Sequence, residues 1–308
     1  MKILVTGGAG FVGSHIVDLL IEQQDEIVIL DDLSTGKEKY INKNAKFYKA
    51  DIRQAEEIND IFEKEKPELV IHTAAQVQLR KSLVEPAIDA AINILGTINV
   101  LEACRKNKVK KIIYTSTGGA RVGEPEYLPV NEKHPLSPCS PYGISKHTAE
   151  HYVWMYNKLY GINYLIFCFG NVYGPRDDAQ FGRVISVFIE KILKGETPKI
   201  FGDGKQTRDF IYVLDLAKFI VKNIDKNPEH KLFHLAYGEQ VSVNEIFEII
   251  KKLASFEAEV EHIETVPGEV RNIVLDTKLV QKELGWKPEY DIKKGIKETY
   301  NWYKNNLK

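Results

Sequence analysis

The sequence predicts an α/β fold with a doubly wound parallel sheet, followed by a smaller mixed α/β lobe in its C-terminal third. Short runs rich in β-branched residues alternate with longer amphipathic stretches in the first half, which is the order of parallel βαβ units. The early runs are apolar almost throughout, as expected for strands with helices on both faces of their sheet. After about residue 170, turn-rich segments break this alternation, which favours a separate, smaller lobe.

The elements follow from these patterns in chain order. Apolar, β-branched runs predict strands at Lys2–Thr6, Glu26–Asp31, Lys46–Lys49, Leu69–His72, Lys111–Ser116 and Asn163–Phe169. Amphipathic periodicity predicts helices near Gly13–Gln23, Ala55–Glu65, Ala87–Lys106 and Tyr142–Tyr160. Ser140 and Pro141 suit the N-cap and first position of the fourth helix. A last helix is expected at Ile292–Asn305, after Gly285-Trp286-Lys287-Pro288.

Composition narrows the class of protein. Of 308 residues, 42 are basic and 43 acidic, so the net charge of −1 disfavours nucleic-acid binding. The sequence contains no run of about 18 consecutive apolar residues, and its first apolar run is too short for a signal peptide, so we expect no membrane partner. Cys104, Cys139 and Cys168 lack metal or redox spacing, as in small buried side chains of a cytoplasmic protein.

A glycine pattern follows the first strand directly. Thr6-Gly7-Gly8-Ala9-Gly10-Phe11-Val12-Gly13 contains G-x-x-G-x-x-G between a strand and a helix. This is a variant of the Rossmann fingerprint, in which glycines permit a tight turn and the close approach of a pyrophosphate. The N-terminus of the following helix offers its backbone N–H groups to the phosphates. We therefore expect a dinucleotide on this turn.

An acidic residue at the end of the second predicted strand indicates which dinucleotide, NAD or NADP, the turn binds. Asp31 lies about 20 residues after the glycines, where a carboxylate accepts hydrogen bonds from the adenosine ribose hydroxyls. The same charge would repel a 2′-phosphate, so NAD is favoured over NADP. Asp32 is a possible substitute, although its side chain should point to the other side of the strand.

The glycine pattern, Asp31 and the change in pattern after about residue 170 predict a division of the chain into two parts. Residues 1–170 are predicted to form an NAD-binding domain of the Rossmann type, to which a segment at about 205–237 returns. Residues 171–204 and 238–308 would form the substrate-binding lobe.

A tyrosine and a lysine four residues apart begin the fourth helix. This spacing places Tyr142 and Lys146 on one helical face. A tyrosine is a poor base at neutral pH, but a neighbouring ammonium group and a nicotinamide cation would both favour its phenolate. A hydroxyl at the end of the preceding strand should complete the site. Thr117 is our first choice because the turn begins there, and Ser116 is the second.

Together these residues resemble the extended short-chain dehydrogenase/reductase superfamily and, within it, the UDP-glucose 4-epimerases. The resemblance extends along the whole chain. The segments that carry it are TGGAGFVG (6–13), LSTG (33–36), DI (51–52), HTAAQ (72–76), Asn93, the Tyr142/Lys146 pair, NVYGPR (171–176), FGDG (201–204), QTRDF (206–210) and GW (285–286).

The resemblance implies tightly held NAD and a homodimer formed through two long helices, here Ala87–Lys106 and Tyr142–Tyr160. The cofactor-binding residues would be Gly7, Gly10, Phe11, Val12, Gly13, Asp31, Asp32, Asp51, Ile52, Ala74, Ala75, Asn93 and Lys146. The substrate, a UDP-hexose or similar nucleotide sugar, would contact Thr117, Tyr142, Asn171, Arg208 and Arg271.

The reaction expected is 4-epimerisation through a transient 4-keto sugar. Related dehydratases carry Asp or Glu just after the threonine, and this chain has Gly118-Gly119 there, which argues against elimination of water.

The C-terminal substrate loop departs from the pattern of the relatives. Relatives often carry R-x-G-D where this chain has Val266-Pro267-Gly268-Glu269, so we expect Arg271 to replace the missing arginine at the diphosphate. Ile273 is the residue expected to limit the bulk of the sugar, and UDP-N-acetylhexosamines, UDP-uronates or a reductase activity stay open.

A second class of function is a zinc hydrolase. His147-Thr148-Ala149-Glu150-His151 matches H-x-x-E-H, whose histidines share one helical face. That face lies roughly 140° from the Tyr142/Lys146 face, and no nearby segment supplies a third ligand. We therefore expect no metal site.

Overall fold

The computed structural model describes residues 1–264 and 270–307. The chain divides into two compact units, which are described separately. The first consists of Met1–Gly123, Leu136–Cys168 and Ala217–Phe233, and the second of Glu124–Pro135, Phe169–Leu216 and His234–Lys308. The domain division expected from the sequence stays a prediction.

The first unit is built on a seven-stranded sheet, counted within the described residues. Its strand order is β11-β6-β5-β4-β1-β2-β3, and the pairs β1–β2, β1–β4, β2–β3 and β4–β5 are parallel. The strands are β1 (Lys2–Thr6), β2 (Glu26–Asp31), β3 (Lys46–Lys49), β4 (Leu69–His72), β5 (Lys111–Thr117), β6 (Asn163–Phe169) and β11 (Leu232–Leu235). All six predicted strands are confirmed, and β5 is one residue longer than expected. The predicted parallel α/β class is therefore correct.

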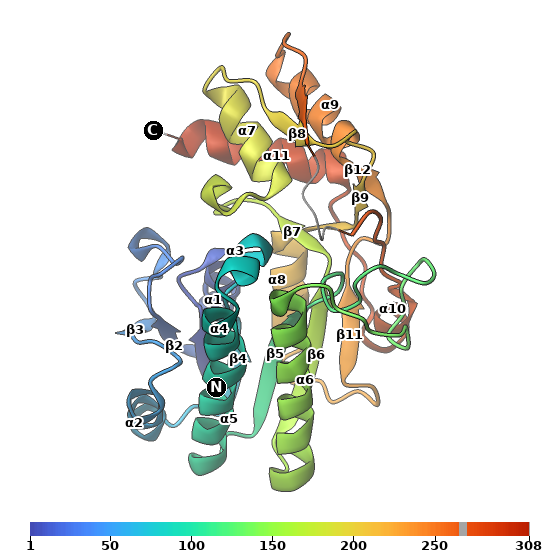
Figure 1. Ribbon diagram of the computed structural model, residues 1–308. Coiled ribbons are helices and arrows are strands. Elements are labelled where there is room, and N and C mark those ends of the chain that lie inside the picture. The colour runs from blue at the N-terminus through green and yellow to red at the C-terminus, as the bar shows by residue number, and fades with distance from the viewer. Residues whose placement is uncertain (265–269, 308) are drawn as a thin grey trace. The chain divides into compact units, whose positions relative to one another are not determined.

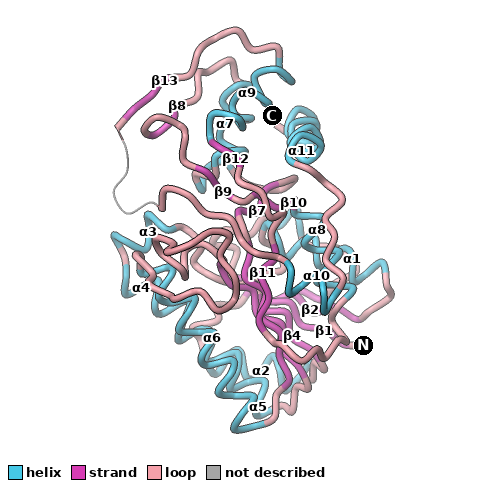
Figure 2. The backbone as a smooth tube through the Cα atoms, turned by 90° about the vertical axis from the view of Figure 1, so that its right-hand side faces the viewer, coloured by secondary structure: helices cyan, strands magenta, loops and turns pink. Residues whose placement is uncertain are grey.

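Helices cover both faces of this sheet (Figure 2). They are α1 (Phe11–Glu22), α2 (Ala55–Glu65), α3 (Leu79–Val84), α4 (Pro86–Ala90), α5 (Thr97–Lys106), α6 (Pro141–Tyr160) and α8 (Val213–Lys222). Figure 2 shows α2, α5 and α6 on one face and α1 and α8 on the other, which is the doubly wound arrangement. On the second face, Phe219 of α8 packs edge-on against Phe167 of β6.

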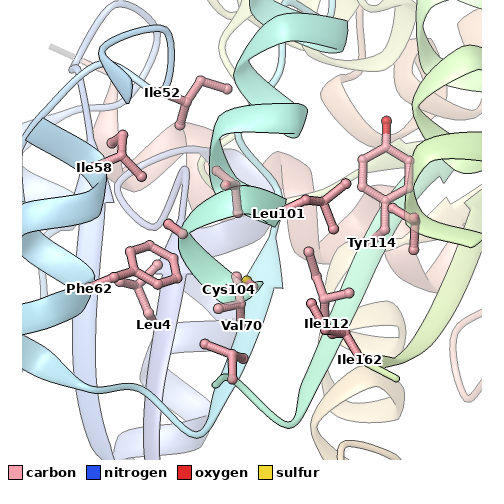
Figure 3. Packing of buried hydrophobic residues seen from close by; sticks show 14 of the residues in the cluster. Leu4, Ile52, Ile58, Phe62, Val70, Leu101, Cys104, Ile112, Tyr114 and Ile162 are labelled. Carbon is pink, nitrogen blue, oxygen red and sulfur yellow. The ribbon is translucent and has the colours of Figure 1, made fainter. Parts of the chain in front are cut away.

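The core on the α2–α5–α6 face is aliphatic in its centre. Leu4, Val70 and Ile112 of three adjacent strands are fully buried against Phe62 and Leu101 of the covering helices (Figure 3). Tyr114 lies at the edge of this cluster, with its hydroxyl directed away from the aliphatic side chains. Burial of these side chains supplies the main driving force for this layer.

The predicted helix at Ala87–Lys106 differs from the structure in its interior. A π-helical segment, Ala91–Gly96, separates α4 from α5, and α3 precedes them without having been predicted. Within the described residues, Pro86–Lys106 is the one helix with the length and composition to cross a membrane. This is weak evidence, because core helices of soluble proteins have the same properties. Its Asp89 and Asn93 are buried and hydrogen-bonded within the first unit, so it does not indicate a membrane span.

The second unit has its own core. Phe188, Ile189, Phe247, Ile250 and Ile296 are buried between three of its helices. Its helices are α7 (Val184–Leu193), α9 (Val243–Ala254), α10 (Lys278–Leu284) and α11 (Ile292–Asn306), and its strands are β7 (Asn171–Tyr173), β8 (Lys199–Phe201), β9 (Thr207–Arg208), β10 (Phe210–Tyr212), β12 (Val241–Ser242) and β13 (Glu261–Ile263). The strands form two-stranded sheets, β7–β10 and β8–β13 parallel and β9–β12 antiparallel. This unit is the mixed α/β lobe that the sequence predicts, and α11 confirms the last predicted helix.

Candidate functional site

The glycine turn between β1 and α1 has the close packing that its sequence predicts. Gly7 has φ of +70°, and its N–H donates to the Leu30 carbonyl of β2. A Cβ on Gly13 would lie 2.1 Å from the Gly7 carbonyl oxygen, so only glycine allows α1 to begin so close to the turn. A Cβ on Gly10 would meet only that oxygen, at 3.1 Å. Phe11 and Val12 are half-buried in the first turn of α1, whose N-terminal N–H groups suit a pyrophosphate.

Asp31, the last residue of β2, is hydrogen-bonded to the glycine turn. Its carboxylate accepts hydrogen bonds from the N–H groups of Ala9 and Leu33, at 3.0 and 2.9 Å. Burial raises the pKa of the Asp31 carboxyl, and the two N–H donors oppose this effect. Because a carboxylate offers about four acceptor positions, two stay available for ribose hydroxyls. Asp32 accepts from the backbone and hydroxyl of Ser34 instead.

Four further predicted cofactor residues lie on two segments of the same unit. Ala74 donates its N–H to Thr6 Oγ1, and its backbone would be 2.7 Å from a Cβ on Gly7, so it borders the glycine turn. Ala75 is half-buried next to it. Asp51 is paired with Arg53, which lowers the pKa of its carboxyl, and Ile52 is buried against Gly96.

Helix α6 begins as its sequence predicts. Ser140 is the N-cap, its Oγ accepting from the Gly143 N–H, and Pro141 occupies the first turn. Tyr142 is half-buried, and its backbone N–H donates to Ser82 Oγ of α3 at 3.2 Å. This contact ties the start of α6 to a helix that the sequence did not predict.

Lys146 is buried, with 3% of its surface exposed. Burial lowers the pKa of its ammonium group to about 8, and the nearby Glu150, Cys168 and Asp89 act against that decrease. Its Nζ lies 4.2 Å from the centroid of the Tyr114 ring, a cation–π contact. Burial raises the pKa of Tyr114 well above its usual range, and the nearby Glu150 adds to this increase, so Tyr114 stays neutral.

The two candidate hydroxyls at the end of β5 have different surroundings. Ser116 is buried and donates its hydroxyl hydrogen bond to Glu150 Oε1 at 2.5 Å. Thr117 is half-buried, and its Oγ1 accepts from the Ala120 N–H. The Ser116 hydroxyl is therefore engaged by Glu150, and the role of Thr117 as the site hydroxyl stays a prediction.

Asn93 belongs to a buried polar network. Its amide nitrogen donates to Ser145 Oγ at 3.0 Å and to Asp89 Oδ1 at 3.2 Å, and its Oδ1 accepts from the Gln76 N–H. Asp89 also accepts from the Ser145 hydroxyl and the Gln76 amide. The network fixes α6 beside α4. Sequence reasoning missed Asp89 and Ser145, although Asp89 stands one helical turn before Asn93.

The predicted substrate residues other than Thr117 and Tyr142 lie in the second unit. Asn171 is exposed at the start of β7, and its N–H donates to the Asp209 carbonyl. Arg208 donates to the backbone carbonyls of Thr207 and Arg271. Arg271 forms an exposed ion pair with Asp203 at 2.8 Å. Ile273, expected to limit the bulk of the sugar, is buried. The Val266–Glu269 segment lies outside the described residues.

The H-x-x-E-H histidines lie close together on α6, and no group of three His, Cys, Asp or Glu side chains placed to hold a metal ion is found among the described residues. His147 Nδ1 lies 3.0 Å from Glu150 Oε2, and the Nε2 atoms of His147 and His151 are 3.2 Å apart. Glu150 is instead an ion-pair partner of Arg121.

Residues 3–236 match the family model "NAD dependent epimerase/dehydratase family". The chain belongs to this family. NAD as the cofactor is thereby confirmed at the level of the family, and the superfamily expected from the sequence is confirmed as well. The glycine turn and Asp31 stay the predicted place of this cofactor in the chain.

Members of this family resemble the chain over its full length. A Methanocaldococcus jannaschii protein, whose name gives UDP-glucose 4-epimerase as a provisional assignment, is 50% identical over 305 residues, which are 99% of both chains. The structure of a Thermotoga maritima UDP-glucose 4-epimerase with UDP-glucose is 38% identical, covers 100% of both chains and has a TM-score of 0.97. A Thermus thermophilus UDP-glucose 4-epimerase in complex with NAD is 35% identical over 100% of both chains, with a TM-score of 0.95.

Proposed function

We propose that this protein is an isomerase that interconverts UDP-glucose and UDP-galactose by NAD-dependent 4-epimerisation. The observation that carries the proposal is the buried Lys146 one helical turn after Tyr142, in the same unit as the glycine turn and Asp31. The full-length similarity to UDP-glucose 4-epimerases supports the choice of substrate.

The chain's own residues would act as follows. Tyr142 removes the proton of the sugar 4-hydroxyl, and the charge of Lys146 favours the tyrosinate that this step needs. Thr117 holds the reacting oxygen by a hydrogen bond. NAD, when bound, supplies the acceptor for the hydride at carbon 4 and returns that hydride. The flat 4-keto sugar is reprotonated at oxygen by Tyr142 after it has turned its other face.

This scheme needs no acid beyond Tyr142. Gly118 and Gly119 follow Thr117, so this turn carries no carboxylate side chain to eliminate water from the neighbouring carbon. Asn171, Arg208 and Arg271 are proposed to bind the nucleotide diphosphate, for which guanidinium groups are well suited.

The subunit arrangement is a further part of the proposal. Large apolar side chains are exposed on α4 to α6, among them Leu95 at 57% and Ile144 at 50%. The α4–α5 and α6 helices lie side by side in the first unit (Figure 1). Exposed apolar surface of this kind favours a subunit contact, and we propose a cytoplasmic homodimer formed through these helices. A Leu95→Glu variant that still sediments as a dimer would count against this interface.

The reaction is tested by incubating the purified protein with UDP- and TDP-sugars, including uronates and acetamido sugars, without added cofactor. We expect UDP-glucose and UDP-galactose to interconvert, and NAD to be released when the protein is denatured. UDP-galactose labelled with deuterium at carbon 4 should retain the label in the product, because the same hydride leaves and returns. Loss of the label to water would overturn the mechanism, and turnover confined to another sugar would overturn the substrate.

A further inference from the structure

The carboxylate of Glu150 is buried beside the catalytic lysine without a role in the scheme above. Glu150 stands one helical turn after Lys146 on α6, and 4% of its surface is exposed. A buried carboxylate needs charge and hydrogen-bond partners to stay ionised. Here the Ser116 hydroxyl donates to Oε1 at 2.5 Å, Arg121 Nη2 lies 3.2 Å from Oε2, and His147 Nδ1 lies 3.0 Å from Oε2.

These partners connect Glu150 to the candidate active site from two sides. Ser116 directly precedes Thr117 at the end of β5, and Arg121 follows in the turn after that strand. On α6, residues four apart lie on the same face, so Glu150 and Lys146 stand one helical turn apart on that face. Glu150 therefore joins the strand that carries Thr117 to the helix that carries Lys146.

Lys146 needs a nearby negative charge, because it is buried and must carry its proton to favour the Tyr142 phenolate. Burial lowers the pKa of this ammonium group, and Glu150 is the largest of the influences that oppose it. We propose that Glu150 is a positioning residue that keeps Lys146 protonated and holds the end of β5 against α6.

Other charges in this cluster determine how the proposal is tested. The groups that face Lys146 or Glu150 from the surrounding elements are Asp89 of α4, Tyr114 of β5, Arg121 of the following turn, Cys168 of β6 and His147 of α6. Arg121 and Glu150 form a buried ion pair with opposite effects on Lys146. The carboxylate stabilises the ammonium group, and the guanidinium destabilises it.

The opposite effects of Glu150 and Arg121 on the pKa of Lys146 distinguish an electrostatic role of Glu150 from a purely structural one. Glu150→Gln removes the negative charge and leaves the Arg121 and Lys146 cations together, so the pKa of Lys146 should fall by about one unit. Arg121→Gln removes the competing cation, so the pKa of Lys146 should rise, by less than it falls in Glu150→Gln. The double variant should lie between the two single variants. A purely structural role predicts shifts of the same sign in the two single variants, since both break the same ion pair.

The experiment measures the titration of Lys146 directly, by NMR of the holoenzyme with ¹³C-labelled lysine side chains. The Lys146 signal is assigned by its absence in Lys146→Arg. Glu150→Asp keeps the charge and serves as the conservative control, in which the titration should stay within a few tenths of a pH unit of the wild type. Single variants that shift in the same direction, or not at all, would overturn the proposal. If Glu150→Gln does not fold, the comparison of Arg121→Gln with Glu150→Asp still tests the sign.

The pH dependence of turnover gives a second readout, which rests on the proposed function. The alkaline limb should move to lower pH in Glu150→Gln and to higher pH in Arg121→Gln. Absence of turnover in the wild type would count against the proposed function alone, since the NMR titration requires no substrate.

Discussion

The contact between Gly13 and the Gly7 carbonyl is the tightest restriction on the predicted NAD site, and it can be tested with a matched pair of variants. A Cβ on Gly13 would lie 2.1 Å from that oxygen, whereas real Cβ atoms stay beyond 3.0 Å, so the turn and α1 must separate by at least about 0.9 Å in Gly13→Ala. Overpacking of this size costs about 1–3 kcal/mol. A loss of this size lowers Tm by about 2–10 °C.

Gly10→Ala provides the control in the same turn. Its nearest neighbour would be 3.1 Å from the new Cβ, and Gly10 has a φ of −81°, which alanine adopts without strain. Its stability should therefore fall by less than about 1 kcal/mol, the usual scale for an N-cap change. Retention of NAD should nevertheless fall in both variants, because Gly10 is where the pyrophosphate is expected to approach the backbone.

The assay compares two quantities for each variant: Tm of the cofactor-stripped protein, and the NAD released from the purified protein on denaturation. Gly13→Ala should lose both stability and NAD, and Gly10→Ala mainly NAD. A Gly13→Ala protein that melts like the wild type and keeps its NAD would refute the close contact. Equal destabilisation of the two variants would show that the distance to the Gly7 carbonyl does not decide the effect.

Three further predictions concern the catalytic and binding side chains. Tyr142→Phe should reduce turnover of UDP-galactose by about 10²–10⁴-fold, the usual contribution of a general base, with NAD still bound; a normal rate would contradict the proposed mechanism. Asp31→Ala should leave less NAD on the purified protein, because the ribose hydroxyls lose their acceptor, and unchanged cofactor content would argue against that role. Arg271→Gln should raise KM for the UDP-sugar without lowering Tm, since its ion pair with Asp203 is exposed; an unchanged KM would exclude Arg271 from the diphosphate site.

Local patterns predicted most of the first unit. All six strands predicted there are present, because buried parallel strands need continuous apolar runs such as Ile27–Leu30. The start of α6 was predictable for a similar reason, since the Ser140 cap and Pro141 act within one helical turn. The helix α3 and the π-helical segment at Ala91–Gly96 were not predicted, because their side chains form contacts that are distant in sequence, such as Ser82 with the Tyr142 backbone.

Some features of the candidate site could likewise be predicted from the sequence, and others needed the structure. Residue types and spacing were enough to select the glycines, Asp31 and the Tyr142/Lys146 pair, because each acts through a local constraint: a turn, a strand end or one face of a helix. The different surroundings of Ser116 and Thr117 needed coordinates, since these show that the Ser116 hydroxyl reaches Glu150.

The sequence by itself determined the class of fold, the nucleotide cofactor and the spacing of the proposed catalytic pair. Only the tertiary structure decided the electrostatic surroundings of Lys146, because Tyr114 of β5, Asp89 of α4 and Cys168 of β6 reach it from elements distant in the sequence. The charge of a buried group depends on every neighbour within a few ångströms, whatever its distance along the chain, and a linear pattern does not contain that information.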